Sequence, residues 1–117
     1  MRHLKKGRKF HRKKGQRRAL LKALVNNLII KEKIETTEAK AKELKSRIEK
    51  LVTFAKKNNL GALRLLLARL PRAAAQKLFY EIAPRYQNRA GGYLRVIKSS
   101  KSRKKDGAET AIIEFIK

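Results

Sequence analysis

The 117-residue sequence predicts one α+β domain, built from a helix, a strand, three helices and two strands, behind a basic N-terminal arm. Three observations support this prediction. The length suits one ordinary domain. The apolar share of 42% is close to that of globular proteins and can supply one core. The apolar spacing changes along the chain between the periods of helices and strands. We expect a basic arm over residues 1–18 and a globular domain over residues 19–117.

The predicted arm is dominated by positive charge. It has ten lysines and arginines, no acidic residue, and only Leu4 and Phe10 as large apolar side chains. Such a segment cannot bury itself, so we expect it to become ordered only against a partner. Its cations are Arg2, Lys5, Lys6, Arg8, Lys9, Arg12, Lys13, Lys14, Arg17 and Arg18.

The region after the arm has apolar residues at helical spacing. Leu20, Leu24 and Leu28 recur every fourth residue and predict a first helix over about residues 16–30. Residues 31–36 combine charged and β-branched residues and predict a short strand.

A second helix follows Thr37, which is a candidate N-cap. Apolar residues from Ala41 to Ala55 recur at spacings of three and four, and Glu38 places negative charge in the first turn. This is the strongest amphipathic pattern of the chain.

Two shorter helices are predicted next. Turn-forming residues at 58–61 separate the second helix from a third, which is expected to end before Pro71. A fourth helix, over about residues 74–82, is expected to stop at Ala83, because Pro84 disfavours the helical conformation of the residue before it.

Two strands are predicted in the last third, over residues 93–99 and 110–116. The second is nearly all apolar, as expected of a strand with neighbours on both sides, whereas the first carries Arg95 and Lys98 and suits an edge. We therefore place the C-terminal strand at the centre of the sheet. Residues 100–107 between them are expected to form an exposed hairpin loop with a cationic tip.

The charge balance indicates a polyanionic partner. Lysine and arginine number 33 against 9 acidic residues, for a net charge of +24. Nucleic acid is the leading candidate. The chain has no cysteine, no apolar run long enough to span a bilayer and no secretory signal pattern, which together predict a cytoplasmic protein without a membrane partner.

Catalytic and metal-binding constellations are hard to assemble from this sequence. His3 and His11 both lie in the arm, where we expect contacts to phosphates or bases and neither general-base chemistry nor metal ligation. The glutamates stand among lysines at spacings that suit surface ion pairs, such as Glu43 with Arg47. We predict no enzymatic activity, metal, cofactor or small-molecule substrate.

The layout of the cations supports nucleic-acid binding. Six to ten phosphate contacts weaken binding by roughly 10³ to 10⁵ between about 50 and 200 mM salt, which is enough to dominate affinity. A second basic region runs from Arg85 through Arg89, Arg95 and Lys98 into the loop at 101–105. A DNA-compacting nucleoid protein would share this charge and stays open as an alternative, although it would usually need dimerisation or a duplex-bending element.

The aromatic residues give a weaker signal for RNA binding. Phe10, Tyr86 and Tyr93 offer planar surfaces for unpaired bases. The other aromatic residues stand in apolar stretches and are expected in the core: Phe54, Phe79, Tyr80 and Phe115.

Four motifs, in order along nearly the whole chain, resemble the bacterial large-subunit ribosomal protein seventeen family. They are the opening MRHLKKGRK, Thr36-Thr37 followed by KAKEL at 40–44, KLFYEIAPRY at 77–86, and RAGGY at 89–93. The resemblance implies a two-layer α/β domain whose three-stranded mixed sheet has the last strand in the middle. It also implies a structural constituent of the large ribosomal subunit, bound to large-subunit ribosomal RNA near the exit-tunnel rim beside neighbouring ribosomal proteins.

The same resemblance implies which residues contact RNA. They fall in the arm, at the junction of the first strand and second helix, and near the double glycine. The implied RNA-binding residues are Arg2, His3, Lys5, Lys6, Arg8, Lys9, Arg12, Arg17, Arg18, Thr36, Thr37, Lys40, Arg89, Arg95 and Lys98.

Overall fold

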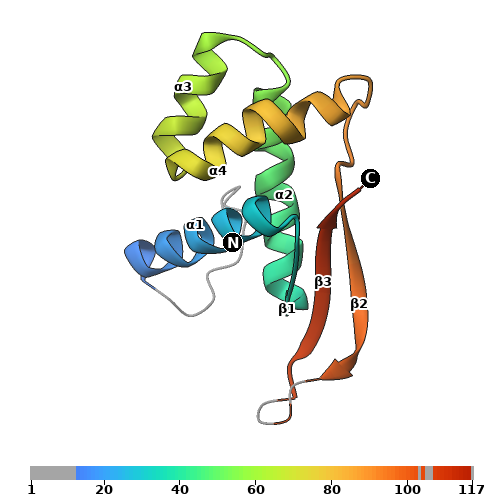
Figure 1. Ribbon diagram of the computed structural model, residues 1–117. Coiled ribbons are helices and arrows are strands. Elements are labelled where there is room, and N and C mark those ends of the chain that lie inside the picture. The colour runs from blue at the N-terminus through green and yellow to red at the C-terminus, as the bar shows by residue number, and fades with distance from the viewer. Residues whose placement is uncertain (1–12, 103, 105–106, 117) are drawn as a thin grey trace, which may run out of the picture.

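The computed structural model, which describes residues 13–102, 104 and 107–116, has helices packed on one face of a three-stranded sheet (Figure 1). The predicted α+β class and element order are confirmed. The elements are α1 (Lys14–Lys31), β1 (Lys33–Thr37), α2 (Glu38–Ala55), α3 (Leu60–Arg69), α4 (Arg72–Lys77), a π-helical turn (Leu78–Ile82), a 3₁₀ turn (Ala83–Tyr86), β2 (Leu94–Ser102) and β3 (Glu109–Phe115).

The sheet has the order β1-β3-β2, so the C-terminal strand is central, as predicted. Both pairings are antiparallel, and Ile113 of β3 lies opposite Ile34 of β1 and Val96 of β2. The expectation of a mixed sheet is therefore wrong for the described strands. The helices between β1 and β2 return the chain so that these strands run in the same direction with a gap between them. The hairpin then inserts β3 into this gap, antiparallel to both neighbours.

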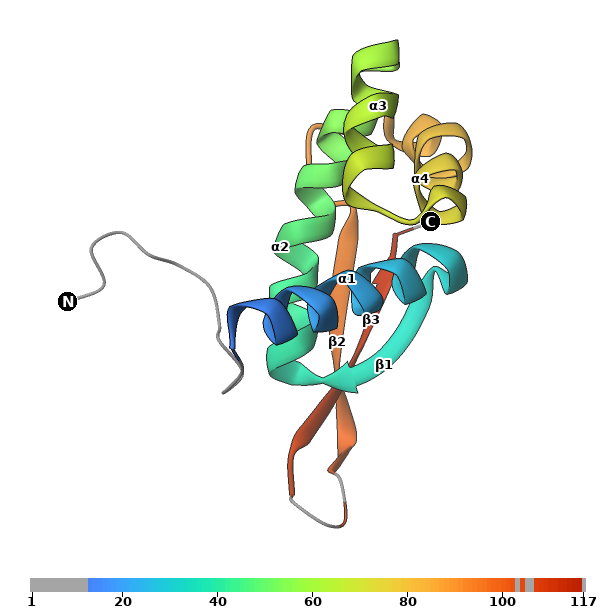
Figure 2. The same ribbon diagram turned by 90° about the vertical axis from the view of Figure 1, so that its left-hand side faces the viewer.

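The core lies between this sheet and the helices. In β3, Ala111, Ile113 and Phe115 are buried at alternate positions. α2 runs along the sheet and buries six apolar residues at spacings of three, four and one, while α1 crosses α2 steeply (Figure 2). The opposite face of the sheet is open, and Ile97 on it is 43% exposed. Among the described helices, none combines the length and apolar character of a membrane span.

The ends of the helices show how local sequence sets the boundaries. α1 ends at Glu32, which adopts a left-handed φ of +64° and donates its backbone N–H to the carbonyl of Leu28. α3 begins after Asn59, whose side chain accepts a 2.8 Å hydrogen bond from the N–H of Ala62. Thr37 occupies the N-cap position of α2, as predicted, but its hydroxyl makes no capping hydrogen bond.

Two boundaries differ from the sequence-based expectation. α1 begins at Lys14, so residues 14–18, assigned to the arm, are its first residues; residues 1–12 lie outside the described part. The fourth helix does not stop at Ala83. It widens into the π-helical turn and then tightens into a 3₁₀ turn, in which Pro84 takes an early position that needs no N–H donor.

Candidate nucleic-acid interface

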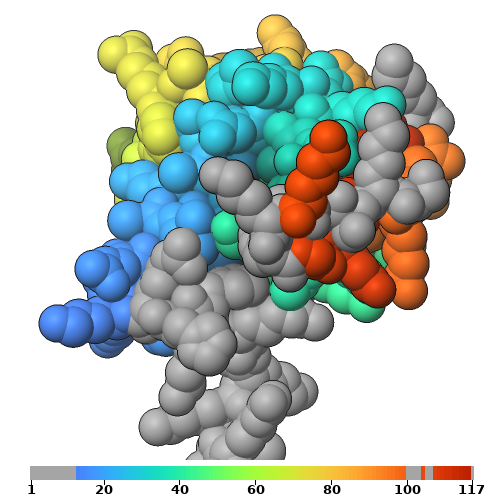
Figure 3. Space-filling view, turned by 90° about the horizontal axis from the view of Figure 1, so that it is seen from below, coloured from blue at the N-terminus to red at the C-terminus, as the bar shows by residue number. Residues whose placement is uncertain are grey.

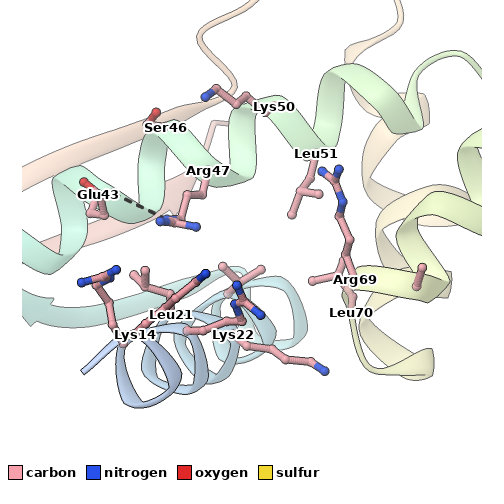
Figure 4. Close-up of a pocket in the computed structure, with 14 residues that line it drawn as sticks. Lys14, Leu21, Lys22, Glu43, Ser46, Arg47, Lys50, Leu51, Arg69 and Leu70 are labelled. Carbon is pink, nitrogen blue, oxygen red and sulfur yellow. Dashed lines mark ion pairs between the residues drawn. The ribbon is translucent and has the colours of Figure 1, made fainter. Parts of the chain in front are cut away.

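A groove about 910 Å³ in volume runs between α1, α2 and the C-terminal end of α3. Fourteen described residues line it, of which seven are cations and one is a carboxylate (Figure 4). We call this surface the α1–α2 groove. Its cations are Lys14, Arg17, Arg18, Lys22, Arg47, Lys50 and Arg69.

Helical spacing places these charges on one face of each helix. On α1, Lys14, Arg18 and Lys22 recur every fourth residue, and on α2, Arg47 and Lys50 are three residues apart. Positions spaced by three or four lie on the same side of a helix. In Figure 4, Arg47 points from α2 toward α1, whereas Lys50 lies on the side of α2 away from α1.

The floor of the α1–α2 groove is apolar. Leu21 is 3% exposed, Leu70 6% and Leu51 8%, and they come from α1, α3 and α2 respectively. The seven cations surround these leucines. Arg17 is half-buried, and the other six cations are exposed. These leucines close the base of the groove, and its accessible surface is formed largely by the cationic side chains around them.

Few carboxylates balance the groove. Arg47 forms a 3.5 Å ion pair with Glu43, as the i to i+4 spacing predicts, and Glu43 is the one acidic residue among the described lining residues. Arg69 lies over the ring of Phe54 at 6.0 Å, a cation–π contact that keeps its charge. An anion in the groove would meet a strongly positive potential.

A second group of predicted contacts lies at the junction of β1 and α2. Glu38 begins α2 and forms ion pairs with Lys42 at 2.7 Å and with Lys98 of β2 at 3.6 Å. The hydrogen bond from Lys42 is the main cause that lowers the pKa of Glu38 to about 2. Lys98 therefore reaches the first residue of α2, but a carboxylate already faces its charge.

Arg95 stands on the open face of the sheet and is also matched by a carboxylate. Its Nε donates a 2.9 Å hydrogen bond to Glu114 of β3, and Lys33 of β1 approaches the same carboxylate at 3.8 Å. The three side chains form a row across the strands.

Arg89 lies in the loop between the 3₁₀ turn and β2, at the other end of α2. Its Nε donates to the carbonyl of Gly91 at 3.1 Å, and Lys56 donates to both the Arg89 carbonyl and the Tyr93 hydroxyl, the latter at 2.9 Å. The hydrogen bond from Lys56 lowers the pKa of Tyr93. These contacts fasten the loop to the end of α2.

The aromatic predictions are partly wrong. Tyr86 and Tyr93 are 4% and 2% exposed, and Tyr86 donates its hydroxyl to the carbonyl of Ile116, so neither ring is free to stack on a base. Tyr80, expected in the core, is 61% exposed. Phe79 and Phe115 are buried as predicted.

Glu32 forms ion pairs with two basic side chains that lie outside the groove. It pairs with Lys77 at 3.3 Å and with Arg85 of the predicted second basic region. The hydrogen bond from Arg85 is the first cause that lowers the pKa of Glu32, and desolvation opposes it. This geometry supports the interpretation of this glutamate as an ion-pairing residue.

The predicted site residues in the described part of the chain thus fall into four separate places, one of which is the open face of the sheet, where Arg95 pairs with Glu114. Arg17 and Arg18 line the groove. A second group lies near the start of α2 and consists of Thr36, Thr37, Lys40 and Lys98. Arg89 lies near the other end of α2, and the two ends of this 18-residue helix are about 27 Å apart. In the view from below, the start of α1 and the β2–β3 hairpin lie at opposite sides of the molecule (Figure 3). The arm residues from Arg2 to Arg12 lie outside the described part.

Sequence reasoning did not select five groove cations as contacts: Lys14, Lys22, Arg47, Lys50 and Arg69. The four-residue spacing on α1 was the available signal, but it becomes visible only if the helix is started at Lys14. Among the described residues, no group of three or more His, Cys, Asp or Glu side chains could hold a metal ion.

Sequence comparisons with known proteins give matches over nearly the whole chain. The family model described as Ribosomal protein L17 matches residues 20–116. The chain is similar to the large ribosomal subunit protein bL17 of Thermodesulfovibrio yellowstonii, at 52% identity over 99% of this chain and 87% of the relative. It is also similar to the bL17 proteins of Persephonella marina, at 53% identity over 99% of this chain and 95% of the relative, and of a Sulfurihydrogenibium species, at 49% identity over 99% and 97%.

Proposed function

Because the chain belongs to the ribosomal protein L17 family and is a structural component of the large ribosomal subunit, we propose that it binds large-subunit ribosomal RNA through its N-terminal arm and its α1–α2 groove. As a member of this family, the chain is a component of the cytoplasmic ribosome and not an enzyme. The proposal extends to the position of the protein, near the rim of the peptide exit tunnel and in contact with neighbouring ribosomal proteins.

The proposal rests on a difference between two surfaces in how many carboxylates lie beside the cations. The α1–α2 groove presents seven cations against one carboxylate, whereas Arg95 and Lys98 on the sheet side each face a glutamate. Cations without a protein carboxylate beside them can neutralise phosphates and so release the counterions condensed on the nucleic acid, which supplies a large share of the affinity for its backbone.

The remaining predicted contacts take a secondary place in the proposal. Thr36, Thr37 and Lys40 offer hydroxyls and one ammonium group near the start of α2, and Arg89 keeps its terminal guanidinium nitrogens for a phosphate while its Nε donates to Gly91. The arm residues Arg2, His3, Lys5, Lys6, Arg8, Lys9 and Arg12 are proposed contacts on their sequence alone.

The proposed RNA binding is tested by filter binding of the full chain to a transcript of the large-subunit ribosomal RNA across a salt series. Specific, strongly salt-dependent binding, with a preference over double-stranded DNA of equal length at matched salt, is the expected result. A preference for DNA would overturn the proposal and favour the nucleoid-associated alternative.

The proposed position is tested separately with stalled ribosomes whose nascent chain has a photoreactive group near its N-terminus. Crosslinks to this protein are expected only when the nascent chain is just long enough to leave the tunnel. Equal or absent crosslinking at every nascent length would contradict a place at the rim.

A further inference from the structure

The face of the sheet that the helices leave open is a charge-balanced surface on an otherwise strongly basic protein. The helices of the described chain pack on the other face, so side chains at alternate positions of the three strands point away from the core (Figure 1). We call this surface the open sheet face. In the regularly paired part of the sheet, its charged and isoleucine side chains are Lys33, Glu35, Arg95, Ile97, Ile112 and Glu114.

One row of the open sheet face is formed by ion pairs. Glu114 of β3 lies between Lys33 of β1 and Arg95 of β2. It accepts a 2.9 Å hydrogen bond from the Nε of Arg95 and pairs with Lys33 at 3.8 Å. Glu114 is mostly buried between these two cations, which are both more than half exposed. The terminal guanidinium nitrogens of Arg95 therefore remain available to a group outside the chain.

The neighbouring row is mostly apolar. Ile112 lies between Glu35 of β1 and Ile97 of β2, two residues along the strands from the ion pairs. Ile97 is 43% exposed and Ile112 is half-buried, so both aliphatic side chains reach the surface. Glu35 is exposed at the β1 end of the row. Apolar residues at the centre with charged residues at the margin are the usual composition of a protein–protein contact.

The charge of the open sheet face differs from that of the α1–α2 groove on the helical side. The open sheet face has two cations and two carboxylates, whereas the groove has seven cations and one carboxylate. A polyanion gains little from a charge-balanced surface and is repelled by the exposed Glu35. A second copy of this chain would bring another net charge of +24 against the first. The open sheet face therefore suits a different protein, with side chains of both signs.

The positions of the available charges define what that protein presents. Glu35 lies at the β1 edge and Arg95 at the β2 edge, two strand spacings apart and one row along, which is a separation of about 12 Å. A matching surface has a basic group opposite Glu35 and an acidic group opposite Arg95. Between them it has an aliphatic or aromatic side chain that covers Ile97 and Ile112. RNA has no cationic group to place opposite Glu35.

From this arrangement we infer that the open sheet face binds a neighbouring protein of the large ribosomal subunit, through an apolar contact on Ile97 and Ile112 and matched charges at Glu35 and Arg95. The inference rests on the proposed contact with neighbouring ribosomal proteins and makes it specific, because it names the surface. Three strands over five residues cover about 14 by 17 Å, which is small beside the roughly 800 Å² per partner of a stable interface. The contact is therefore expected where both proteins are held on the same RNA, which raises their effective concentration.

The test uses assembled large ribosomal subunits that contain the full chain with a photoreactive benzophenone amino acid in place of Ile97. The subunits are purified and irradiated, and the crosslinked peptides are located by mass spectrometry. We expect a crosslink from position 97 to one protein, at an apolar segment with a basic residue nearby. The same group in place of Tyr80, which is 61% exposed in the π-helical turn, is the control and should not reach that segment. If the group at position 97 prevents incorporation into subunits, it is placed at Thr110, in the next row of the same face.

A charge reversal then tests the matched charges. Glu35→Lys, combined with the photoreactive group, should lower the yield of that crosslink by about fivefold, because an attractive contact becomes a repulsive one. Replacing the basic residue of the crosslinked segment by glutamate should restore the yield. Glu81→Lys is the matched control, since Glu81 is exposed in the π-helical turn and the same change of charge there should leave the yield unaltered.

The inference would be overturned if the photoreactive group reached ribosomal RNA, a second copy of this chain, or nothing. Equal yields for Glu35→Lys and Glu81→Lys would also overturn it. Amine-reactive crosslinking of the same subunits, which reports on the exposed lysines, separates this outcome from the proposed function. If the lysines reach neighbouring proteins but position 97 does not, the inference fails while the proposed contact with ribosomal proteins stands. If neither reaches a protein, the proposed contact fails as well.

Discussion

Replacing Glu32 by glutamine should destabilise the domain in the absence of any RNA. Glu32 ends α1 in a left-handed conformation, and its carboxylate pairs with Lys77 of α4 and Arg85 of the 3₁₀ turn. Its backbone carbonyl also accepts a 3.1 Å hydrogen bond from the N–H of Phe115 at the end of β3. Glutamine keeps the backbone and the size of the side chain, so the substitution isolates the charge.

The magnitude follows from two ion pairs on a partly exposed carboxylate. The Glu32 side chain is 31% exposed, and pairs at such sites contribute about 0.2–1 kcal/mol each. We expect the free energy of unfolding to fall by about 1 kcal/mol in total. For a domain of this size that corresponds to a Tm lower by about 4 °C.

The loss should depend on pH in a defined direction. Because Arg85 and Lys77 lower the pKa of Glu32 in the folded state, the carboxylate stabilises the fold fully above its unfolded value of 4.5. This stabilisation disappears as the pH falls through the lowered folded pKa. The difference in unfolding free energy between the original and the variant should thus be constant near neutrality, shrink as the pH falls below 4.5, and vanish below the lowered pKa of folded Glu32.

Urea denaturation at a series of pH values measures this difference, and Glu35→Gln is the matched control. Glu35 is exposed on β1, so its substitution removes the same charge three residues away. General repulsion within a chain of net charge +24 would affect both variants equally. The stabilising role of the Glu32 ion pairs would be refuted if Glu32→Gln lowered the free energy of unfolding no more than Glu35→Gln does. It would also be refuted if the decrease were as large at pH 3 as at neutral pH.

Three further predictions concern the core, the backbone and the arm. Ile48→Ala removes a fully buried side chain of α2 and should lower the unfolding free energy in urea by about 2–5 kcal/mol with little change in the m value. Gly92→Ala should lower the free energy of unfolding by about 1–2 kcal/mol, because the φ of Gly92 is +63°. Gly15→Ala should raise the free energy of unfolding by about 0.5–1 kcal/mol, because Gly15 lies within α1 and an added Cβ would have open space around it. Deleting residues 2–12 should leave Tm nearly unchanged, since α1 begins at Lys14, and should reduce the salt slope of RNA binding by about 4.

The elements of the fold were predictable because each depends on a local pattern. The spacing from Ala41 to Ala55 defines α2, and the apolar character of residues 110–116 places β3 between two neighbours. The direction of the strands was not predictable in this way, since it depends on how three helices return the chain. The π-helical turn at Leu78–Ile82 has no signature in composition either, and it shifts the helical register of everything after it.

The aromatic residues were assigned to the core because they stand in apolar stretches of the sequence. Tyr80 lies off the helical face that buries Leu78, Phe79 and Ile82, and it is 61% exposed. After the 3₁₀ turn, Tyr86 packs near the rings of Tyr93 and Phe115, with centroid distances of 5.2 and 6.5 Å. Which aromatic face reaches solvent is decided by packing between segments that are distant in sequence.

The α1–α2 groove could not be predicted from the sequence for a similar reason. The cations from Lys14 to Arg18 looked like the end of an arm, because no acidic or large apolar residue lies among them. The helix that contains them is stabilised through Leu21, Val25 and Leu28, further along α1, which pack into the protein. The opposite margin of the groove comes from α2, and no short sequence window contains both.

The few acidic residues explain why this basic chain has a folded domain with a positively charged groove. Of the nine, Glu32, Glu38, Glu49 and Glu114 each connect separate elements. Glu32 joins α1 to α4, Glu38 joins α2 to β2, Glu114 joins β3 to both edge strands, and Glu49 accepts a 3.1 Å hydrogen bond from the N–H of Gly92. Three of these glutamates, Glu32, Glu38 and Glu114, also pair with the cations beside them. None of the four lines the α1–α2 groove, so an RNA strand bound there would meet one carboxylate among the described lining residues.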